Sequence, residues 1–219
     1  MKQQKKLRLA IGLLTAFLLW TAAIQLIDVR PIGPQGSSVG FAAMNQFVHN
    51  LTGVHMSLYH ITDWLGLIPL VFVLGFGLLG LVQWVKRKRL LKVDSDLLVL
   101  GGFYLAVFAA YTLFEIFVVN YRPVLIHGFL EASYPSSTTM LALCVMPTAI
   151  MQWNARIKHK VLRRCVTAAA SAFMVFLVIG RLIAGVHWFT DIVGGVLLSA
   201  GLVLLYCAAA YRQPPIPLR

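Results

Sequence analysis

The residues of this chain best suited to covalent chemistry are a histidine and an aspartate four positions apart. His187 and Asp191 close the segment Arg181-Leu-Ile-Ala-Gly-Val-His187-Trp-Phe-Thr-Asp191. Residues at positions i and i+4 of a helix lie one above the other. Asp191 can therefore hold one imidazole nitrogen and leave the other as a nucleophile. Such a pair can equally be a capping or structural contact, so other residues must support it.

Two arginines supply the next part of the pattern. Apart from the basic clusters described below, the only Lys or Arg residues are Arg30, Arg122 and Arg181. Arg122 and Arg181 fall at the ends of predicted membrane spans, where burying a guanidinium is costly without an anionic partner. The run Pro-Ser-Ser-Thr-Thr at 135–139 begins a further predicted helix, whose free N–H groups favour an anion. Ordinary helix capping also explains that run.

The elements that must position these residues are membrane helices. Of the 219 residues, 59% are hydrophobic and only 12% are charged, which excludes an ordinary soluble domain. A membrane span needs roughly 20 apolar residues. The first such stretch follows a basic start, and we expect it to be retained rather than cleaved as a signal peptide. The predicted spans are 9–27, 65–85, 97–119, 137–153, 165–183 and 188–210.

The net charge of +12 follows the predicted topology. The basic residues form four clusters, which a six-span chain places on one side of the membrane. The clusters are the N-terminal tail, 86–92, 156–164, and the C-terminal Arg212 and Arg219. The positive-inside rule assigns that side to the cytoplasm. The charge therefore indicates topology and no nucleic-acid partner.

Two further patterns concern packing. In the outer segment 28–64, apolar residues recur at helical spacing and predict an interfacial helix; they are Phe41, Met44, Phe47, Val48 and Leu51. Glycines inside the spans predict close helix contact; they are Gly75, Gly77, Gly80, Gly101, Gly102, Gly194 and Gly195.

The three polar segments together resemble the type 2 phosphatidic acid phosphatase (PAP2) superfamily. Its pattern is KxxxxxxRP, then PSGH, then SRxxxxxHxxxD. Here the first motif retains Arg122-Pro123, and the third reads Gly180-Arg181, five residues, His187, three residues, Asp191. The resemblance implies an all-α polytopic membrane protein. We expect one domain over 1–219, a six-helix bundle with an extra-cytoplasmic interfacial helix and active-site segments at 120–139 and 180–191.

The resemblance also implies the role of each residue. His187 would attack phosphorus to form a phosphohistidine, and Asp191 would orient the imidazole. Arg122 and Arg181 would bind the phosphate oxygens and neutralise their charge without a metal. We therefore expect no metal and no cofactor. The hydroxyl residues expected to help bind phosphate are Ser136, Ser137 and Thr138.

Three positions depart from the family pattern. Glu115 stands where the first motif has lysine, Thr138 replaces the histidine of the second motif, and Gly180 replaces a serine. Glu115 could pair with an arginine. His127 and Arg30 are candidate substitutes for the missing acid and the missing cation.

Thr138 bears most on the substrate, because the missing histidine is the acid that protonates the leaving group. Without an acid, expulsion of a glycerolipid alkoxide could slow by on the order of 10²–10⁴. A lipid diphosphate releases a phosphate monoester of far lower pKa. The sequence therefore predicts that undecaprenyl diphosphate or another lipid diphosphate is preferred over phosphatidate.

Two classes of function remain open. The first is a phosphohydrolase or phosphotransferase at the outer leaflet of a bacterial cytoplasmic membrane, acting on a phosphorylated membrane lipid. The second is a degenerate relative that binds or carries such a lipid without hydrolysing it. An unrelated transporter fits less well, because Glu115 is the only clear intramembrane acid. The sequence leaves the oligomeric state open.

Overall fold

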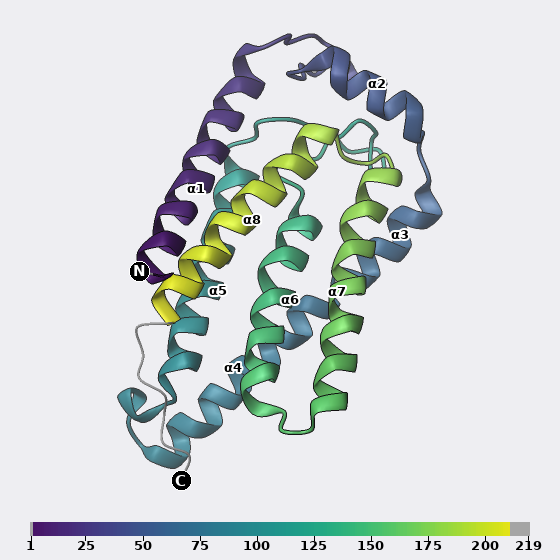
Figure 1. Cartoon of the computed structure of the whole chain (residues 1–219). Coiled ribbons are helices and arrows are strands. Elements are labelled where there is room, and N and C mark those ends of the chain that lie inside the picture. Colours follow the sequence, from purple (N-terminus) through teal and green to yellow (C-terminus); the bar gives the residue numbers. More distant parts are fainter. Residues whose placement is uncertain (1, 211–219) are drawn as a thin grey trace.

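The computed structural model describes residues 2–210, which form helices, loops and three isolated backbone bridges. Two short 3₁₀ turns, η1 (Pro34–Gly36) and η2 (Leu90–Lys92), lie in loops. The all-α membrane fold predicted from the sequence is confirmed. Six long helices run side by side, and α2 crosses one end of them (Figure 1). The α-helices are α1 (Lys2–Leu26), α2 (Ala42–Thr52), α3 (Met56–Leu65), α4 (Ile68–Arg87), α5 (Ser95–Ile116), α6 (Ser137–Arg156), α7 (Lys160–Ile183) and α8 (Phe189–Ala210).

Each predicted span corresponds to one of the six long helices. Within residues 2–210, five segments are long and apolar enough to cross a membrane: Gln3–Leu26, Met56–Arg87, Ser95–Ile116, Lys160–Ile183 and Phe189–Ala210. The sixth helix, α6, has 20 residues and packs against α4, α7 and α8. Half of its residues are buried inside the protein, including Thr139, Thr148 and Gln152. Fewer of its side chains therefore face lipid, and the helix can be less apolar than the other five. The count of six membrane crossings remains a prediction.

The core of the bundle is built around α8, which packs against α1, α5 and α6. Small residues allow the close approach. A Cβ atom at Gly201 would lie 2.8 Å from Leu14 of α1, and one at Gly195 would lie 3.1 Å from Thr139 of α6. A Cβ atom at Gly194 would overlap the ring of Tyr134. Close helix contact was predicted for both glycines, and it is confirmed for Gly195. Gly194 makes its close contact with Tyr134 of the loop before α6 instead of with a helix.

The same prediction is wrong for the glycines of α4 and α5. A Cβ atom added at any of them would meet nothing within 4 Å; they are Gly75, Gly77, Gly80, Gly101 and Gly102. Glycine permits close contact only where a second helix presents a matching surface. Here α4 and α5 leave an open apolar groove between them instead.

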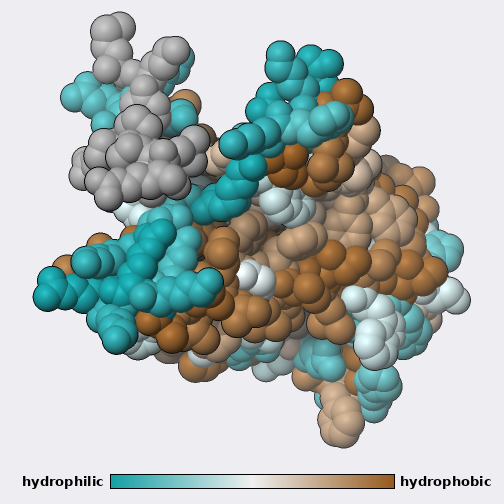
Figure 2. All heavy atoms as spheres, turned by 90° about the horizontal axis from the view of Figure 1, so that it is seen from below, coloured by the Kyte–Doolittle hydropathy of each residue, from teal (hydrophilic) through white to brown (hydrophobic). Residues whose placement is uncertain are grey.

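The basic clusters of the described chain gather at one end of the bundle. The loop between α4 and α5 and the loop between α6 and α7 lie at the lower end in Figure 1, and α1 starts higher up, beside the end of α8 and at its own lower end. Viewed from that end, hydrophilic residues form separate ridges with hydrophobic surface between and around them (Figure 2). This arrangement fits the predicted grouping by charge. Arg212 and Arg219, assigned to the same side from sequence, lie outside the described residues.

The segment between α1 and α4 covers the opposite end. Helix α2 forms where an interfacial helix was predicted, and its Phe47 and Leu51 are exposed. Its Asn45 is fully buried and bonds the carbonyl of Gly40 and the hydroxyl of Thr190. The second half of the segment differs from the prediction, because α3 packs against α7 instead of forming part of a separate surface segment.

Candidate active site

His187 lies in the short turn between α7 and α8. Gly185 of this turn has a φ of +69°, and a Cβ atom there would overlap the carbonyl oxygen of Gly53. Only glycine fits both conditions. The amide of His55 donates to the carbonyl of Ala184 at 3.0 Å and fixes the turn against the linker between α2 and α3. The His187 side chain is consequently buried, with 3% of its surface exposed.

His187 and Asp191 are close but do not bond directly. His187 precedes α8, and Asp191 lies in the first turn of that helix, so the expected stacking on one helix does not occur. The Nδ1 atom of His187 lies 3.8 Å from Asp191 Oδ2, which is too long for a hydrogen bond. Instead Nδ1 lies 3.0 Å from Ser133 Oγ and 3.1 Å from the Ser133 carbonyl oxygen.

Ser133 connects the two residues. Its hydroxyl donates to Asp191 Oδ2, so its oxygen can accept from the Nδ1–H group of His187. Asp191 is fully buried and also accepts from the amide of Trp188 at 2.8 Å and the side chain of Asn120 at 3.3 Å. Three donors thus fix the carboxylate, and the carboxylate and the serine in turn orient the imidazole.

The other imidazole nitrogen faces two guanidinium groups. Nε2 of His187 lies 3.4 Å from Arg122 Nη1 and 3.5 Å from Arg181 Nη2. Arginine only donates hydrogen bonds, so Nε2 must carry its lone pair and Nδ1 the proton. Burial, followed by the charges of Arg122 and Arg181, holds the pKa of His187 well below its usual value. The imidazole is therefore neutral at neutral pH.

Each arginine also has an acidic neighbour. Arg122 Nε lies 3.1 Å from Glu131 Oε2, and Arg181 Nη1 lies 3.4 Å from Asp63 Oδ1. The guanidinium of Arg181 also stacks over the ring of Tyr59 at 5.0 Å. Both arginines are buried, whereas Glu131 and Asp63 are 41% and 54% exposed. The carboxylates can therefore turn outward when a phosphate takes their place.

The predicted hydroxyl residues lie at the start of α6 and face different cavities. Ser136 is the N-cap residue, and its buried hydroxyl has no hydrogen-bond partner in the described chain. Ser137 lines a polar cavity of about 460 Å³ together with Arg122, Glu115 and Glu131. Thr138 and Ser137 line a second cavity of about 380 Å³. Ser137 is thus the hydroxyl residue that borders both.

Glu115, Arg30 and His127, the three auxiliary candidates from the sequence, lie in different places in the structure. Glu115 lines the polar cavity with Arg122, but the carboxylate in contact with that arginine is Glu131. Arg30 pairs with Asp28 at 2.7 Å in the loop after α1, so it does not replace the missing lysine. His127 is exposed in a tight turn closed by hydrogen bonds between Ile126 and Phe129. The structure brings only Glu115 to the site.

Sequence reasoning missed four residues that complete the site. Ser133 and Asn120 lie in the loop between α5 and α6, and Asp63 and Glu131 are the acidic neighbours of the arginines. Ser133 stands two residues before Pro135 of the second motif. Its place in the sequence could therefore have indicated a loop residue near His187. The two carboxylates carried no spacing signal, because α3 and the loop meet the arginines only in the folded chain.

At this end of the membrane helix bundle, a buried imidazole lies between a serine–aspartate pair and two guanidiniums, and guanidiniums are groups that bind phosphate. The sequence profile of the PAP2 superfamily matches residues 98–214, which is more than half of the chain. The protein therefore belongs to the PAP2 superfamily.

One solved structure shares the fold over almost the full length of both chains. It is the first transmembrane PAP2-type phosphatidylglycerolphosphate phosphatase from Bacillus subtilis, with a TM-score of 0.63 and 20% sequence identity. The similarity covers 94% of this chain and 98% of that one. No curated protein sequence matches this chain. The family and the fold support a membrane lipid phosphatase in general.

Proposed function

We propose that this protein is a lipid phosphate or diphosphate phosphatase that acts through a phosphohistidine at His187. The observation that carries the proposal is the position of Nε2, which directs its lone pair between two buried guanidiniums. A protein that only binds phosphate needs the arginines. It has no need of an imidazole whose other nitrogen is fixed by a serine and a carboxylate.

The reaction would proceed in two displacements. Nε2 forms a bond to phosphorus, and the bond from phosphorus to the leaving oxygen breaks with its electron pair. Arg122 and Arg181 neutralise the charge on the equatorial oxygens, and Nδ1–H stays hydrogen bonded to Ser133 as the ring becomes positive. Water then attacks phosphorus and the N–P bond breaks with its electron pair returning to Nε2, which restores the neutral imidazole. The protons of the attacking water leave with the released inorganic phosphate.

The substrate class follows from the leaving group. Thr138 cannot protonate an alkoxide near neutral pH, so a leaving group of low pKa is favoured. A lipid diphosphate, such as undecaprenyl diphosphate, has such a leaving group because it expels a phosphate monoester. We therefore propose that diphosphates react faster than phosphatidate at this site.

The side of the membrane follows from charge. The α4–α5 and α6–α7 loops lie at the end of the bundle opposite the turn between α7 and α8 (Figure 1), and that turn contains His187. If those loops are cytoplasmic, His187 faces the outer leaflet and takes substrate there. We propose this orientation in a bacterial cytoplasmic membrane, with both termini on the cytoplasmic side.

A second candidate is a degenerate member that binds a phosphorylated lipid without hydrolysing it. One observation favours it: Glu131 and Asp63 already neutralise the arginines, and no histidine occupies the second motif. In that case phosphate would compete with the carboxylates for the guanidiniums, and His187 would serve only to space them.

The deciding experiment is phosphate release by purified protein in detergent with EDTA, from undecaprenyl diphosphate and from phosphatidate. His187→Ala is the test variant, and His159→Asn, which keeps a capping residue at the far end of the bundle, is the matched control. We expect release from the diphosphate to persist in the control and to vanish in the test variant. Lipid binding without release by the unaltered protein would establish the second candidate instead.

A further inference from the structure

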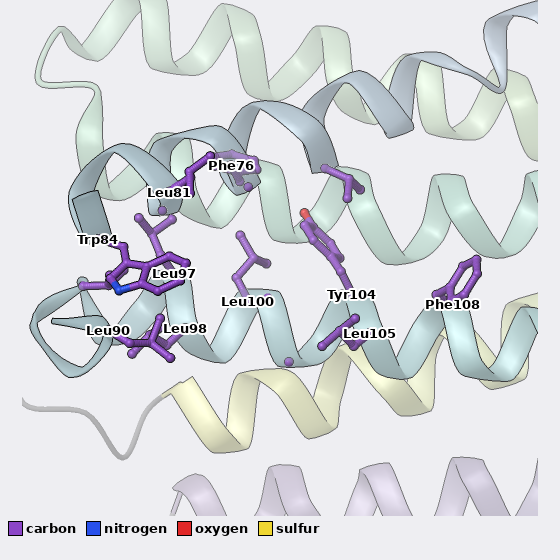
Figure 3. Close-up of a pocket in the computed structure, with 16 residues that line it drawn as sticks. Phe76, Leu81, Trp84, Leu90, Leu97, Leu98, Leu100, Tyr104, Leu105 and Phe108 are labelled. Carbon is purple, nitrogen blue, oxygen red and sulfur yellow. The ribbon is translucent and has the colours of Figure 1, made fainter. Parts of the chain in front are cut away.

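A long apolar groove runs between α4 and α5, away from the histidine. Its volume is about 610 Å³, and its lining comes from both helices and the loop that joins them (Figure 3). Phe76 and Trp84 of α4 and Leu97, Leu100 and Leu105 of α5 form much of the surface. The hydroxyl of Tyr104 is bonded to Thr148 of α6 at 3.1 Å. The groove is therefore built for hydrocarbon.

The groove continues into the active site through a shared set of residues. Val73, Tyr104 and Phe108 line both the groove and the cavity of about 380 Å³ that reaches Ser137 and Thr138. That cavity in turn shares Tyr111 and Ser137 with the polar cavity at Arg122. An apolar path thus leads from the phosphate-binding end toward the basic end of the bundle.

The path is longer than one leaflet. Tyr111 lines it at the site, and Leu97 lines it near the other end. At 1.5 Å per residue these positions on α5 are about 21 Å apart along the helix axis. The hydrocarbon core of one leaflet is only about 15 Å thick. A chain that filled the whole path would pass the middle of the bilayer.

Glycines keep the path open. Gly77 and Gly80 of α4 and Gly101 and Gly102 of α5 line the groove, and an added Cβ atom at each would meet nothing within 4 Å. Larger side chains at these positions would extend into the space and reduce it. Four lining glycines with no helix packed on them indicate room for an occupant, since an empty apolar space loses packing contacts.

We propose that this groove binds the hydrocarbon chain of the lipid whose phosphate reacts at His187, and that it favours a single chain long enough to cross the bilayer midplane. The inference rests on the proposed function and adds a specificity determinant to it. The occupant is the substrate itself because the groove adjoins the cavity beside Ser137 and Thr138, with which it shares Val73, Tyr104 and Phe108. A polyprenyl chain has the required chemistry and reach.

The first test fills the groove. Gly101→Leu and Gly77→Leu place side chains in it, whereas Gly75→Leu adds the same side chain to an equally open position on α4 outside the lining. Rates are measured with undecaprenyl diphosphate and with farnesyl diphosphate, whose chain is much shorter. We expect the first two variants to lower kcat/KM for the long substrate about tenfold, because overfilling an apolar site costs that much. The short substrate and the Gly75→Leu control should change less than twofold.

The second test does not need turnover. The His187→Ala variant is incubated with undecaprenyl phosphate that carries a photoreactive group near its tail, and the site of crosslinking is mapped. We expect crosslinks on α5 between Leu97 and Leu105, and excess unlabelled undecaprenyl phosphate should abolish them.

The outcomes separate the two proposals. If the unaltered protein hydrolyses neither substrate but the tail crosslinks to α5, the phosphatase proposal fails and the groove assignment stands. If hydrolysis occurs while Gly101→Leu affects long and short substrates equally, the groove assignment fails alone. A change of oligomeric state in Gly77→Leu without a change in chain preference would also overturn it, because the groove would then hold a second helix.

Discussion

Glycines have opposite effects on packing in the two halves of this bundle. On α8, Gly195 lets Thr139 of α6 approach the helix backbone, and Gly194 does the same for Tyr134 of the loop before α6. The same loop carries Ser133, which bonds Asp191. Between α4 and α5, glycines such as Gly101 face open space. The difference shows that a glycine in a membrane span has no fixed meaning. The surface opposite it decides whether it closes a contact or opens a groove.

The two halves should also differ in how well they tolerate substitutions. On the α6–α8 side the polar atoms are buried and bonded, so small changes of shape reach His187. On the α4–α5 side the lining is apolar and open, so we expect substitutions there to change which hydrocarbon chain fits and to leave the chemistry intact.

Arg181→Lys tests the polar side at its most sensitive point. Lysine keeps the charge but loses the planar fork that lies over Tyr59 and beside Nε2. We expect kcat/KM to fall about 10²–10³-fold, as when an enzyme loses a transition-state donor. Steady-state kinetics measures the loss, and Arg163→Lys at the other end of α7 is the control. Equal activity in the two variants would contradict the assigned role.

Ser133→Ala tests the link between Asp191 and the imidazole. Removing the hydroxyl leaves the Ser133 carbonyl as the remaining contact of Nδ1 at this residue. We expect kcat to fall about 10–100-fold, the usual cost of losing an orienting partner, with little change in KM. Ser133→Thr should restore part of the rate because it keeps the hydroxyl. A larger effect on KM than on kcat would place Ser133 in binding instead.

Gly194→Ala and Gly75→Ala compare the two glycine environments directly. The first adds a Cβ atom that overlaps the ring of Tyr134, and the second adds one in open space. We expect Gly194→Ala to lower the free energy of unfolding by about 1–3 kcal/mol and Gly75→Ala to leave it unchanged or raise it by up to about 1 kcal/mol. Thermal unfolding in detergent measures both, and similar values would remove the contrast.

The smallest expected effect is a shift in the pH dependence of kcat/KM. His187 has its pKa held well below 6.5 by burial and by the charges of Arg122 and Arg181, so the acid limb of kcat/KM should lie below pH 6.5. Arg122→Gln removes one of those charges, so the pKa should rise and the limb should move to higher pH. A limb that stays in place would show that the charge of Arg122 does not act on the imidazole.

The same shift sets the sign of a stability effect. Above pH 6.5 His187 is neutral in the folded and unfolded chains, and its contribution to stability is complete. As the pH falls below 6.5 the unfolded chain binds a proton that the folded chain resists, so stability declines toward the folded pKa. His187→Ala should flatten this part of the stability profile.

The long helices could be read from the sequence because hydrophobic runs of membrane length have few other solutions. Their ends could not: α7 begins at Lys160, before the apolar stretch predicted from 165, because a helix can continue through basic residues outside the lipid. The arginines and His187 were recognisable by type and spacing. Ser133 and Asp63 were not, since their positions depend on how a loop and α3 fold back onto the bundle.

Tyr134, next to Ser133, shows the same limit. Its ring lies against Phe17, and its hydroxyl bonds Thr21 of α1 at 2.7 Å. Nothing in the sequence connects residues 113 positions apart. Contacts of this range arise from tertiary packing, which local patterns do not encode.

The pairing of α1 with α8 has a consequence for biosynthesis. Helix α1 packs along α8, and Trp20 of α1 donates to the carbonyl of Thr190, next to Asp191. A nascent or truncated chain that lacks α8 has Arg122, Ser133 and the imidazole of His187, but it lacks the carboxylate of Asp191 and the helix that α1 packs against. The proposed site therefore needs α8 for its assembly, and we expect chains interrupted before α8 to be inactive on lipid phosphates.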